Sequence, residues 1–371
     1  MSQMVWPHGG DIYGSDKIRL DFSVNTSPLG TPQAVIDAVA SCREEILRYP
    51  DSQCRKLKAA LSDVWKIPSS RLICTNGAAD LIFGLAEAVR PRRAVLFSPC
   101  FSEYESALSL KGCEISYARL EAGENWLPDA SVLEEILSKQ KGTDLVFLGN
   151  PNNPTGMALP AEKMENFVKI CARYNALLAV DECFNGFLEK PEEFTMAGML
   201  ERYGNLLILN AFTKTYGMAG VRLGYGMSGN RELLLRIEAV RPPWSVSGIA
   251  QKAGIAALTQ PDFPKQAAEL VRREREFLKN GLSKLGFRVW PSMVNYLLFS
   301  VFPDENERGF GTELGDFLLK QGILIRSCAN FRGLDRSFYR ICVKTRKENE
   351  ELLQYIARWA ESEKCEWQRR L

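Results

Sequence analysis

The stretch that decides the fold is residues 205–226, which read NLLILNAFTKTYGMAGVRLGYG. Its apolar run from Leu206 to Leu209 is short, unbroken and rich in branched side chains, which is typical of a strand buried on both faces. Lys214 follows shortly after this run. Because open α/β sheets bind ligands outside the carboxyl ends of their strands, we expect Lys214 to lie at a binding site. Partial burial there lowers the pKa of an amine, and a neutral lysine can form an imine with an aldehyde.

Two more predicted strands end in polar residues. Ala176 to Val180 is a short apolar run followed by Asp181, and Asp144 to Leu148 leads into NPNNPTG at residues 150–156. An imine-forming lysine together with an acid that pairs with a pyridinium nitrogen is what a pyridoxal 5′-phosphate (PLP) site needs. A lone lysine is usually a solvated surface residue, so the prediction depends on these accompanying motifs.

The three motifs carry a family resemblance. NPNNPTG, then VDE at 180–182, then FTK at 212–214 with Arg222 following, resembles the class I/II aminotransferase family of PLP enzymes, which have fold type I. The resemblance extends over essentially the whole chain. It implies an α/β fold with a mostly parallel central sheet flanked by helices, and a smaller α+β domain. We expect a large PLP-binding domain at 45–255 and a small domain formed by 1–44 together with 256–371.

The resemblance also implies which residues hold the cofactor. Lys214 would bind PLP as an imine and Asp181 would keep its ring nitrogen protonated, so these two are the expected catalytic residues. A strand-to-helix turn is expected to bind the cofactor phosphate, because a helix N-terminus favours an anion. The residues of this turn are Gly77, Ala78 and Ala79, and the other expected contacts are Phe101, Asn153, Thr213, Arg222 and Tyr49. In the family, the tyrosine that matches Tyr49 reaches across a dimer interface to the partner subunit's PLP phosphate. The resemblance therefore implies a homodimer with a shared active site.

Other segments point to the substrate. HGG at 8–10, LDFSVNTSPLG at 20–30 and PPWSV at 242–246 resemble threonine-phosphate decarboxylases, which are close relatives of histidinol-phosphate aminotransferases. Arg340 matches the family arginine that binds the substrate's α-carboxylate, and a planar guanidinium suits that role. The resemblance implies that His8, Gly9 and Asn25 lie at the substrate phosphate. Taken alone, His8 would be a tail residue and Arg340 a solvated strand residue.

Two positions depart from the common family pattern. Phe184 stands where many relatives have a tyrosine that bonds the cofactor's ring oxygen, and Ala211 stands where a serine or threonine often contacts the phosphate. We expect these changes to affect how tightly PLP is held, and not which cofactor is bound.

The preferred function is a PLP-dependent decarboxylation of L-threonine O-3-phosphate to 1-aminopropan-2-ol phosphate, a step of cobalamin biosynthesis. The alternative is an aminotransferase that acts on histidinol phosphate or a related amino acid. The two reactions differ in which bond at the substrate's Cα stands perpendicular to the cofactor ring, and a shared scaffold does not decide that. A PLP-binding regulatory module without activity is a remote third interpretation, disfavoured because Lys214, Asp181 and Arg340 are all present.

Composition excludes several other classes. The chain has 371 residues, 46% of them hydrophobic and 25% charged, with a formal net charge of +2. Without a basic block it is not expected to bind nucleic acid or a membrane surface, and no run approaches the ~20 apolar residues of a membrane span. The ten cysteines contain no C-x-x-C pair, and no secretory signal is visible, so we expect a cytoplasmic protein with reduced thiols. With a single histidine, His8, we expect no metal site.

Local patterns predict several helices. Pro32 to Leu47 has the apolar spacing of one helix, with Thr31 as its N-cap, and Phe263 to Leu285 has that of a long amphipathic helix. Strand-like segments alternate with helical ones from about 94 to 227, which is typical of βαβ units.

Overall fold

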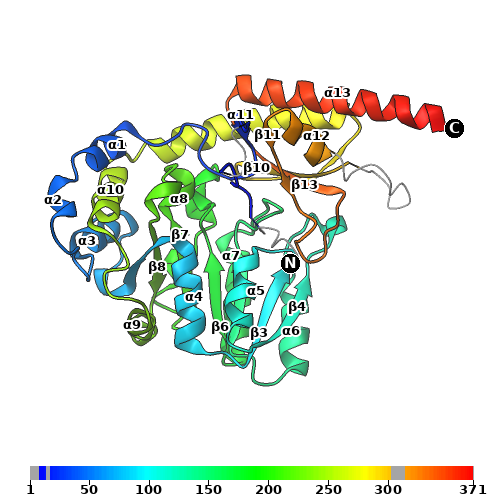
Figure 1. Cartoon of the computed structure of the whole chain (residues 1–371). Coiled ribbons are helices and arrows are strands. Elements are labelled where there is room, and N and C mark those ends of the chain that lie inside the picture. Colours follow the sequence, from blue (N-terminus) through cyan, green and yellow to red (C-terminus); the bar gives the residue numbers. More distant parts are fainter. Residues whose placement is uncertain (1–7, 14–16, 302–313, 371) are drawn as a thin grey trace, which may run out of the picture.

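The computed structural model describes residues 8–13, 17–301 and 314–370, with side chains of the last helix described as far as residue 362. Its main sheet has seven strands in the order β2-β8-β7-β6-β5-β3-β4 (Figure 1). Neighbouring strands are parallel except where β8 is involved, since β8 runs antiparallel to both β2 and β7. The strands are β2 (Leu72–Thr75), β3 (Arg93–Ser98), β4 (Glu114–Arg119), β5 (Leu145–Gly149), β6 (Leu177–Asp181), β7 (Leu206–Ala211) and β8 (Gly224–Ser228). The predicted α/β fold with a mostly parallel central sheet is confirmed.

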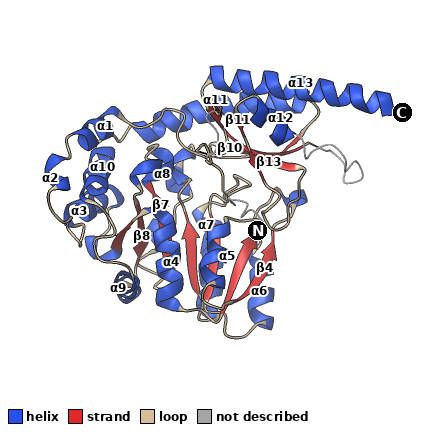
Figure 2. Cartoon of the chain, viewed as in Figure 1, coloured by secondary structure: helices blue, strands red, loops and turns tan. Residues whose placement is uncertain are grey.

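Helices cover both faces of this sheet (Figure 2), which explains its unbroken apolar strands. Alternate side chains of a strand point to opposite faces: in β3, Leu96 packs in one apolar cluster and Phe97 in the other. One cluster includes α4 (Gly77–Val89), α5 (Ser102–Ser109) and α9 (Arg231–Val240). The other includes α1 (Gln33–Ala40), α3 (Arg55–Trp65), α6 (Ala130–Lys139), α7 (Ala161–Arg173) and α10 (Gly248–Leu258).

A smaller sheet lies beyond the carboxyl ends of the parallel strands, at the top of Figure 1. Its order is β12-β13-β10-β9, and every pair in it is antiparallel. Near it, β1 from the N-terminal region pairs in parallel with β11. The elements are β1 (Leu20–Asp21), β9 (Arg288–Val289), β10 (Tyr296–Ser300), β11 (Ile323–Leu324), β12 (Arg326–Ser327), β13 (Phe338–Cys342), α11 (Phe263–Lys284), α12 (Leu314–Lys320) and α13 (Arg346–Arg370).

The domain limits proposed from the sequence stay a prediction. The N-terminal arm pairs with β11 through β1, and the N–H of Cys342 on β13 donates to the carbonyl of Phe22, which ties the arm to the smaller sheet. However, Val35 of α1 is buried in the same cluster as the α10 side chains of the larger part. The N-terminal segment therefore contacts both parts of the molecule.

The predicted helix from Pro32 to Leu47 is wrong in two respects. The chain forms α1 and a separate short helix, α2 (Arg43–Ile46), with a break at Ser41 and Cys42. Thr31 does not cap α1: its hydroxyl donates to the carbonyl of Gly217 at 2.9 Å, and Pro32 occupies the N-cap position. A tertiary hydrogen bond has replaced the local one, which the sequence pattern could not reveal.

Candidate active site

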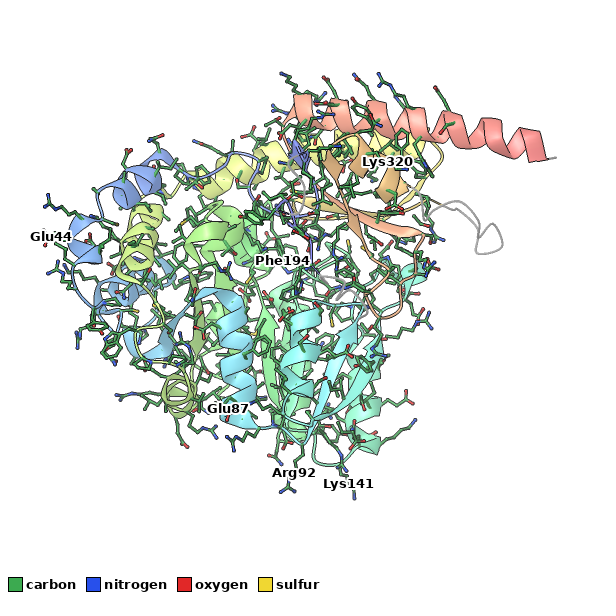
Figure 3. All side chains as sticks on the ribbon, in the orientation of Figure 1. Glu44, Glu87, Arg92, Lys141, Phe194 and Lys320 are labelled. Atoms are coloured by element: carbon green, nitrogen blue, oxygen red, sulfur yellow. The ribbon has the colours of Figure 1, made fainter. Side chains whose placement is uncertain are left out.

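The candidate site lies at the carboxyl edge of the main sheet, which faces the smaller sheet. Figure 3 shows Arg92 and Lys141 at the opposite edge. Asp181 is the last residue of β6, and Lys214 lies in α8 (Phe212–Thr215), directly after β7. Arg222 precedes β8, and because β8 is antiparallel to β7, its beginning lies at this same edge. The change of strand direction therefore brings Arg222 to the ends of the parallel strands.

A pocket at this edge gathers most of the predicted cofactor residues. Its lining residues are Ala78, Ala79, Phe101, Tyr104, Pro151, Asn153, Asp181, Cys183, Phe184, Thr213, Lys214 and Arg222. Of the predicted cofactor residues, only Gly77 and Tyr49 are outside this lining. We call this part of the site the cofactor end.

Lys214 is a buried lysine with an altered pKa. Burial lowers the pKa of its amine, and the positive charges of Arg340 and Arg222 act in the same direction, whereas Cys183 and Asp181 oppose it. Its Nζ lies 5.5 Å from the centre of the Phe184 ring. A lowered pKa increases the fraction of neutral amine, which is the form that reacts with an aldehyde.

Asp181 is held by two protein donors. The Tyr104 hydroxyl donates to its Oδ2 at 2.7 Å, and the Cys183 backbone N–H donates to its Oδ1 at 2.9 Å. An ionised carboxylate only accepts hydrogen bonds, so both contacts suit its charged form. The carboxylate is thereby fixed at the end of β6, beside the pocket.

The first turn of α4 and the Arg222 guanidinium lie side by side at one corner of the pocket. Gly77 has a φ of +78°, and a Cβ built on it would lie 2.6 Å from a guanidinium nitrogen of Arg222. Only glycine allows the arginine to approach the backbone this closely. The helix begins without a side-chain cap, which leaves backbone N–H groups of its first turn available to an anion.

The NPNNPTG loop positions Asn153 between the two parts of the molecule. The Asn152 side chain donates to the carbonyl of Pro99 at 3.0 Å, and the Tyr296 hydroxyl donates to the carbonyl of Asn152 at 2.8 Å. Asn153 follows directly, and its Oδ1 accepts a hydrogen bond from the Arg340 guanidinium. The loop therefore connects the cofactor pocket to Arg340.

Arg340 lies on β13 with its guanidinium buried. One nitrogen donates to the carbonyl of Ser23 at 2.7 Å, whereas Nε is buried without a hydrogen-bond partner among the described residues. The Oδ1 of Asn25 is likewise buried and without a described partner. Such orphaned polar atoms in a buried region are expected where a ligand completes the hydrogen bonds.

His8 and Gly9 lie against the same region. His8 Nε2 is 2.8 Å from Oε1 of Glu103, and its ring centre is 6.0 Å from that of Phe101. A Cβ on Gly9 would lie 2.5 Å from the carbonyl oxygen of Ser23, so the arm packs tightly on the segment that holds Arg340. The N-terminal arm thus reaches Phe101, which lines the pocket, while the predicted contact of His8 and Gly9 with a substrate phosphate stays a prediction.

Tyr49 does not line the pocket of its own chain. It is 78% exposed, and its ring lies 4.6 Å from that of Trp244. The predicted contact of Tyr49 with a cofactor requires a second subunit and stays a prediction.

Three neighbouring residues were missed from the sequence. Tyr104 follows Phe101, the N-cap residue of α5, by three positions, and this spacing of about one helical turn was a usable signal that the two rings lie close together. Glu103 pairs with His8, and Arg326 of β12 stands directly opposite Arg340 of β13. The pairing of the two arginines depends on strand register, which gives no signal in the sequence.

Of the two departures from the family pattern, Phe184 belongs to the pocket lining and Ala211 does not. Phe184 lines the pocket, and its ring meets that of Tyr296 edge-on at 5.0 Å. Ala211 is buried in a cluster that Ala78 packs against. Their predicted effect on the tightness of PLP binding stays a prediction.

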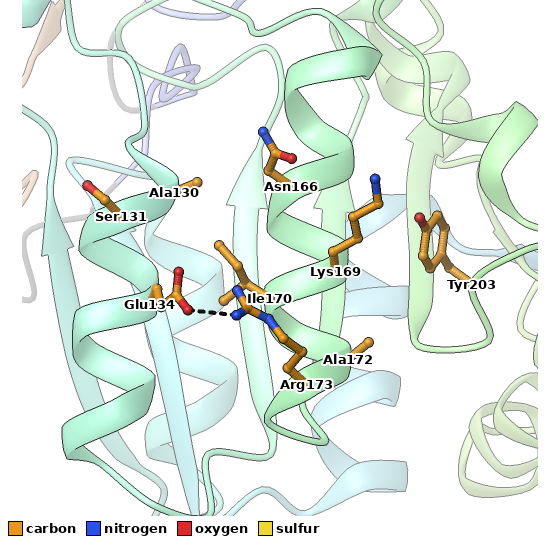
Figure 4. Close-up of a pocket in the computed structure, with 9 residues that line it drawn as sticks. All are labelled: Ala130, Ser131, Glu134, Asn166, Lys169, Ile170, Ala172, Arg173 and Tyr203. Atoms are coloured by element: carbon orange, nitrogen blue, oxygen red, sulfur yellow. Dashed lines mark ion pairs between the residues drawn. The ribbon is translucent and has the colours of Figure 1, made fainter.

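A second pocket lies on the outer surface between α6 and α7 (Figure 4). Its charged groups pair with nearby acids, Arg173 with Glu134 at 2.9 Å and Lys169 with Glu165 at 3.3 Å. These exposed ion pairs offer no activated group, whereas the Lys214 pocket contains an amine whose pKa is lowered by burial. Nor does the described part of the chain place three or more histidine, cysteine or acidic side chains where they could hold a metal ion.

The family model described as aminotransferase class I and II matches residues 17–356. The chain belongs to this family. Its cofactor is PLP, and the predicted membership among PLP-dependent enzymes is confirmed. No helix in the described ranges of this aminotransferase-family enzyme is long and apolar enough to cross a membrane.

Known proteins similar to this family member carry out two reactions. A threonine-phosphate decarboxylase from Salmonella typhimurium is 33% identical, over 93% of this chain and 94% of the relative. A histidinol-phosphate aminotransferase from Methanosphaera stadtmanae is 31% identical, over 90% of this chain and 88% of the relative. The structure of a histidinol-phosphate aminotransferase from Sinorhizobium meliloti in complex with PLP has a TM-score of 0.82 at 22% identity, covering 93% of this chain and 92% of that one. The expected PLP fold type I is thereby confirmed.

The residues of this aminotransferase-family pocket fit PLP. Lys214 would provide an amine of lowered pKa for the aldehyde, and Asp181 would provide a fixed carboxylate for the ring nitrogen. Arg222 and the uncapped start of α4 provide donors for the phosphate. The three functional groups of the cofactor therefore each have a matching group in the pocket.

Proposed function

We propose that this enzyme is a decarboxylase that converts L-threonine O-3-phosphate to 1-aminopropan-2-ol phosphate. The observation that carries the proposal is the pair of arginines, Arg326 and Arg340, at opposed positions of β12 and β13. Burial lowers the pKa of both guanidinium groups, that of Arg326 to about 10, with the charge of Arg340 adding to the effect. Two partly buried cations side by side favour a ligand with two anionic groups, and this substrate has a carboxylate and a phosphate.

The proposed substrate residues hold the molecule at both ends. Arg340 would bind the α-carboxylate, while Arg326, His8, Gly9 and Asn25 would surround the phosphate. We call these five residues the substrate end. The close packing of Gly9 on Ser23, whose carbonyl also holds Arg340, supports a single binding surface.

When bound, PLP draws electrons from the bond at the substrate's Cα that stands perpendicular to its ring. Fixing both ends of the substrate determines which bond at Cα stands perpendicular to the ring. In this proposal it is the bond from Cα to the carboxylate. CO₂ would leave along that bond, and the protonated form of Lys214 Nζ would then deliver a proton to Cα as a general acid. The lowered pKa of this amine makes its protonated form a stronger acid. Asp181, held by Tyr104 and Cys183, would keep the proton on the ring nitrogen.

An aminotransferase acting on histidinol phosphate is the second candidate. It is supported by the 31% identity to the Methanosphaera enzyme and by the arginine pair, which would also suit a dicarboxylic keto acid. The same Lys214 would then move the proton at Cα while the carboxylate stays in place.

We further propose a homodimer with a shared active site. Exposed apolar side chains gather around α2 and the segment that follows it: Ile46, Leu47 and Tyr49 are 70%, 72% and 78% exposed, and Tyr49 packs on Trp244, which is 48% exposed. An exposed apolar surface of this kind is typical of a protein interface. A second copy of the chain would bring its Tyr49 to this chain's cofactor.

A cytoplasmic location is proposed too, supported by nine described cysteines that are all free thiols.

The test is product analysis with both phosphate substrates. Holoenzyme incubated with O-phospho-L-threonine is expected to release CO₂ and form 1-aminopropan-2-ol phosphate while its cofactor stays in the PLP form. Stoichiometric conversion to pyridoxamine phosphate without CO₂, or rapid turnover of histidinol phosphate that requires 2-oxoglutarate, would select the aminotransferase. His8→Ala should raise KM for the phosphorylated substrate more than it lowers kcat, because His8 is proposed to bind and not to react.

A further inference from the structure

Tyr104 is a buried tyrosine in the active site that the family motifs do not identify. It is 2% exposed and lines the cofactor pocket. Its hydroxyl donates to Asp181 Oδ2 at 2.7 Å, a short hydrogen bond to a carboxylate of the kind that is stronger than a neutral one. No step described above uses this hydroxyl directly, so its function is open to inference.

The ring of Tyr104 is fixed from two sides. It stacks on Phe147 of β5 with the ring centres 4.9 Å apart and the planes 4° apart. It meets Phe101 edge-on at 5.8 Å and 86°. With the ring held this way, the hydroxyl has one direction, toward the end of β6 where Asp181 lies.

The hydroxyl stays protonated and therefore remains a donor. Burial raises the pKa of Tyr104 well above its usual value, and the charge of Asp181 and the hydrogen bond to it add to this effect. The other groups that face Tyr104 are Cys100 and Cys183, which also raise its pKa. Since Asp181 accepts from Tyr104 through one oxygen and from the Cys183 backbone through the other, both oxygens are oriented by the protein.

We propose that Tyr104 is a positioning residue that holds Asp181 as an oriented anion and limits how strongly it draws the proton away from the ring nitrogen of PLP. Without this donor, Asp181 is a stronger base and takes a larger share of the proton. The ring then carries less positive charge, and the nitrogen that links it to Lys214 becomes more basic. The start of α5 and its N-cap residue would thus control both a face of the pocket, through Phe101, and the acidity of the cofactor, through Tyr104.

The test compares two tyrosine variants of the holoenzyme. Tyr104→Phe removes the hydroxyl that donates to Asp181, and Tyr203→Phe removes a hydroxyl that donates to Glu165, also at 2.7 Å, in the outer pocket of Figure 4. The readouts are the dissociation constant of PLP and the pH midpoint of its visible absorbance change. The groups facing Lys214 are Cys183, Arg340, Asp181 and Arg222, and none of them is changed in either variant.

For Tyr104→Phe we expect PLP to bind about tenfold more weakly, since Asp181 loses the hydrogen bond that orients it for the ring nitrogen, and we expect the pH midpoint to rise. Tyr203→Phe should leave both values at those of the wild type. An unchanged midpoint and unchanged PLP affinity in a folded Tyr104→Phe protein would overturn the proposal. If that variant loses its native circular dichroism, 3-fluorotyrosine at position 104 decides. Its hydroxyl is a stronger donor, so the midpoint should fall, and an unchanged midpoint would overturn the proposal.

This inference depends on PLP binding and not on the reaction proposed above. An enzyme that transaminates would contradict the decarboxylase and leave the Tyr104 measurements intact. Conversely, if the enzyme decarboxylates and Tyr104→Phe leaves the PLP spectrum and its pH midpoint unchanged, only the positioning role of Tyr104 is contradicted.

Discussion

At the cofactor end, side chains from the ends of neighbouring strands meet because one sheet aligns them, whereas at the substrate end they come from distant parts of the chain. Asp181 and Lys214 follow adjacent parallel strands, β6 and β7. By contrast, Arg340 is held by the carbonyl of Ser23, 317 positions earlier in the sequence. The cofactor end is therefore a product of the sheet itself, and the substrate end depends on how the N-terminal arm and the smaller sheet come together.

The largest effect should follow a change at the cofactor end. Lys214→Ala is expected to lose the covalent link to PLP and essentially all turnover, because it removes the amine that binds the aldehyde and carries the proton. Borohydride reduction followed by mass spectrometry should fix PLP on Lys214 of the wild type and of the control Lys141→Ala, an exposed lysine at the other edge of the sheet. Reduced PLP attached to a different lysine in the wild type would contradict the assignment.

The substrate end should respond differently. Arg340→Ala is expected to lower kcat/KM by about 30- to 1000-fold, as for loss of a buried charged hydrogen-bond partner, while PLP stays bound. Arg326→Ala should raise KM, and Arg336→Ala, an exposed arginine in the loop between β12 and β13, should change little. Loss of PLP from Arg340→Ala would show that the two ends are not separable in this way.

A shared active site would extend the comparison to a second chain. Tyr49→Phe is expected to weaken PLP retention about tenfold, the effect of one hydrogen bond to a charged group. Mixing it with Lys214→Ala protein should produce hybrid dimers with one intact site, and hence with partial activity. A fully active monomer in sedimentation experiments would refute the shared site.

The smallest effect should be on stability alone. Glu182 is fully buried, and burial raises its pKa to about 7, while hydrogen bonds from Thr195 and the Met196 N–H oppose the shift. A carboxyl whose pKa is higher in the folded state contributes stability that is complete below its unfolded pKa, about 4.5, and is lost as the pH rises through about 7. Glu182→Gln should remove this dependence. As the pH rises from 5 to 8, the melting temperature of the wild type should therefore fall by a few degrees relative to that of Glu182→Gln.

A parallel loss of melting temperature in wild type and Glu182→Gln across that range would contradict the raised pKa. The holoenzyme should be used for both, at a fixed excess of PLP, because bound ligand itself raises the melting temperature.

The sequence predicted the cofactor end more completely than the substrate end for a physical reason. Asp181, Asn153 and Lys214 stand in short motifs next to apolar strands, and the ends of parallel strands share one edge of a sheet. Arg326 has no such motif, and its position opposite Arg340 depends on the register of β12 and β13. Likewise, the partners of Thr31 and His8 lie far along the chain, at Gly217 and Glu103, where local patterns carry no information.

The most direct test of the central claim, that the two ends together direct the enzyme to decarboxylation, is the number of CO₂ molecules released per bound PLP. The holoenzyme would receive O-phospho-L-threonine alone, with no keto acid present. We expect many CO₂ molecules per PLP, with the visible spectrum of PLP retained throughout. A spectrum that changes once to the pyridoxamine form, with no CO₂ released, would contradict it.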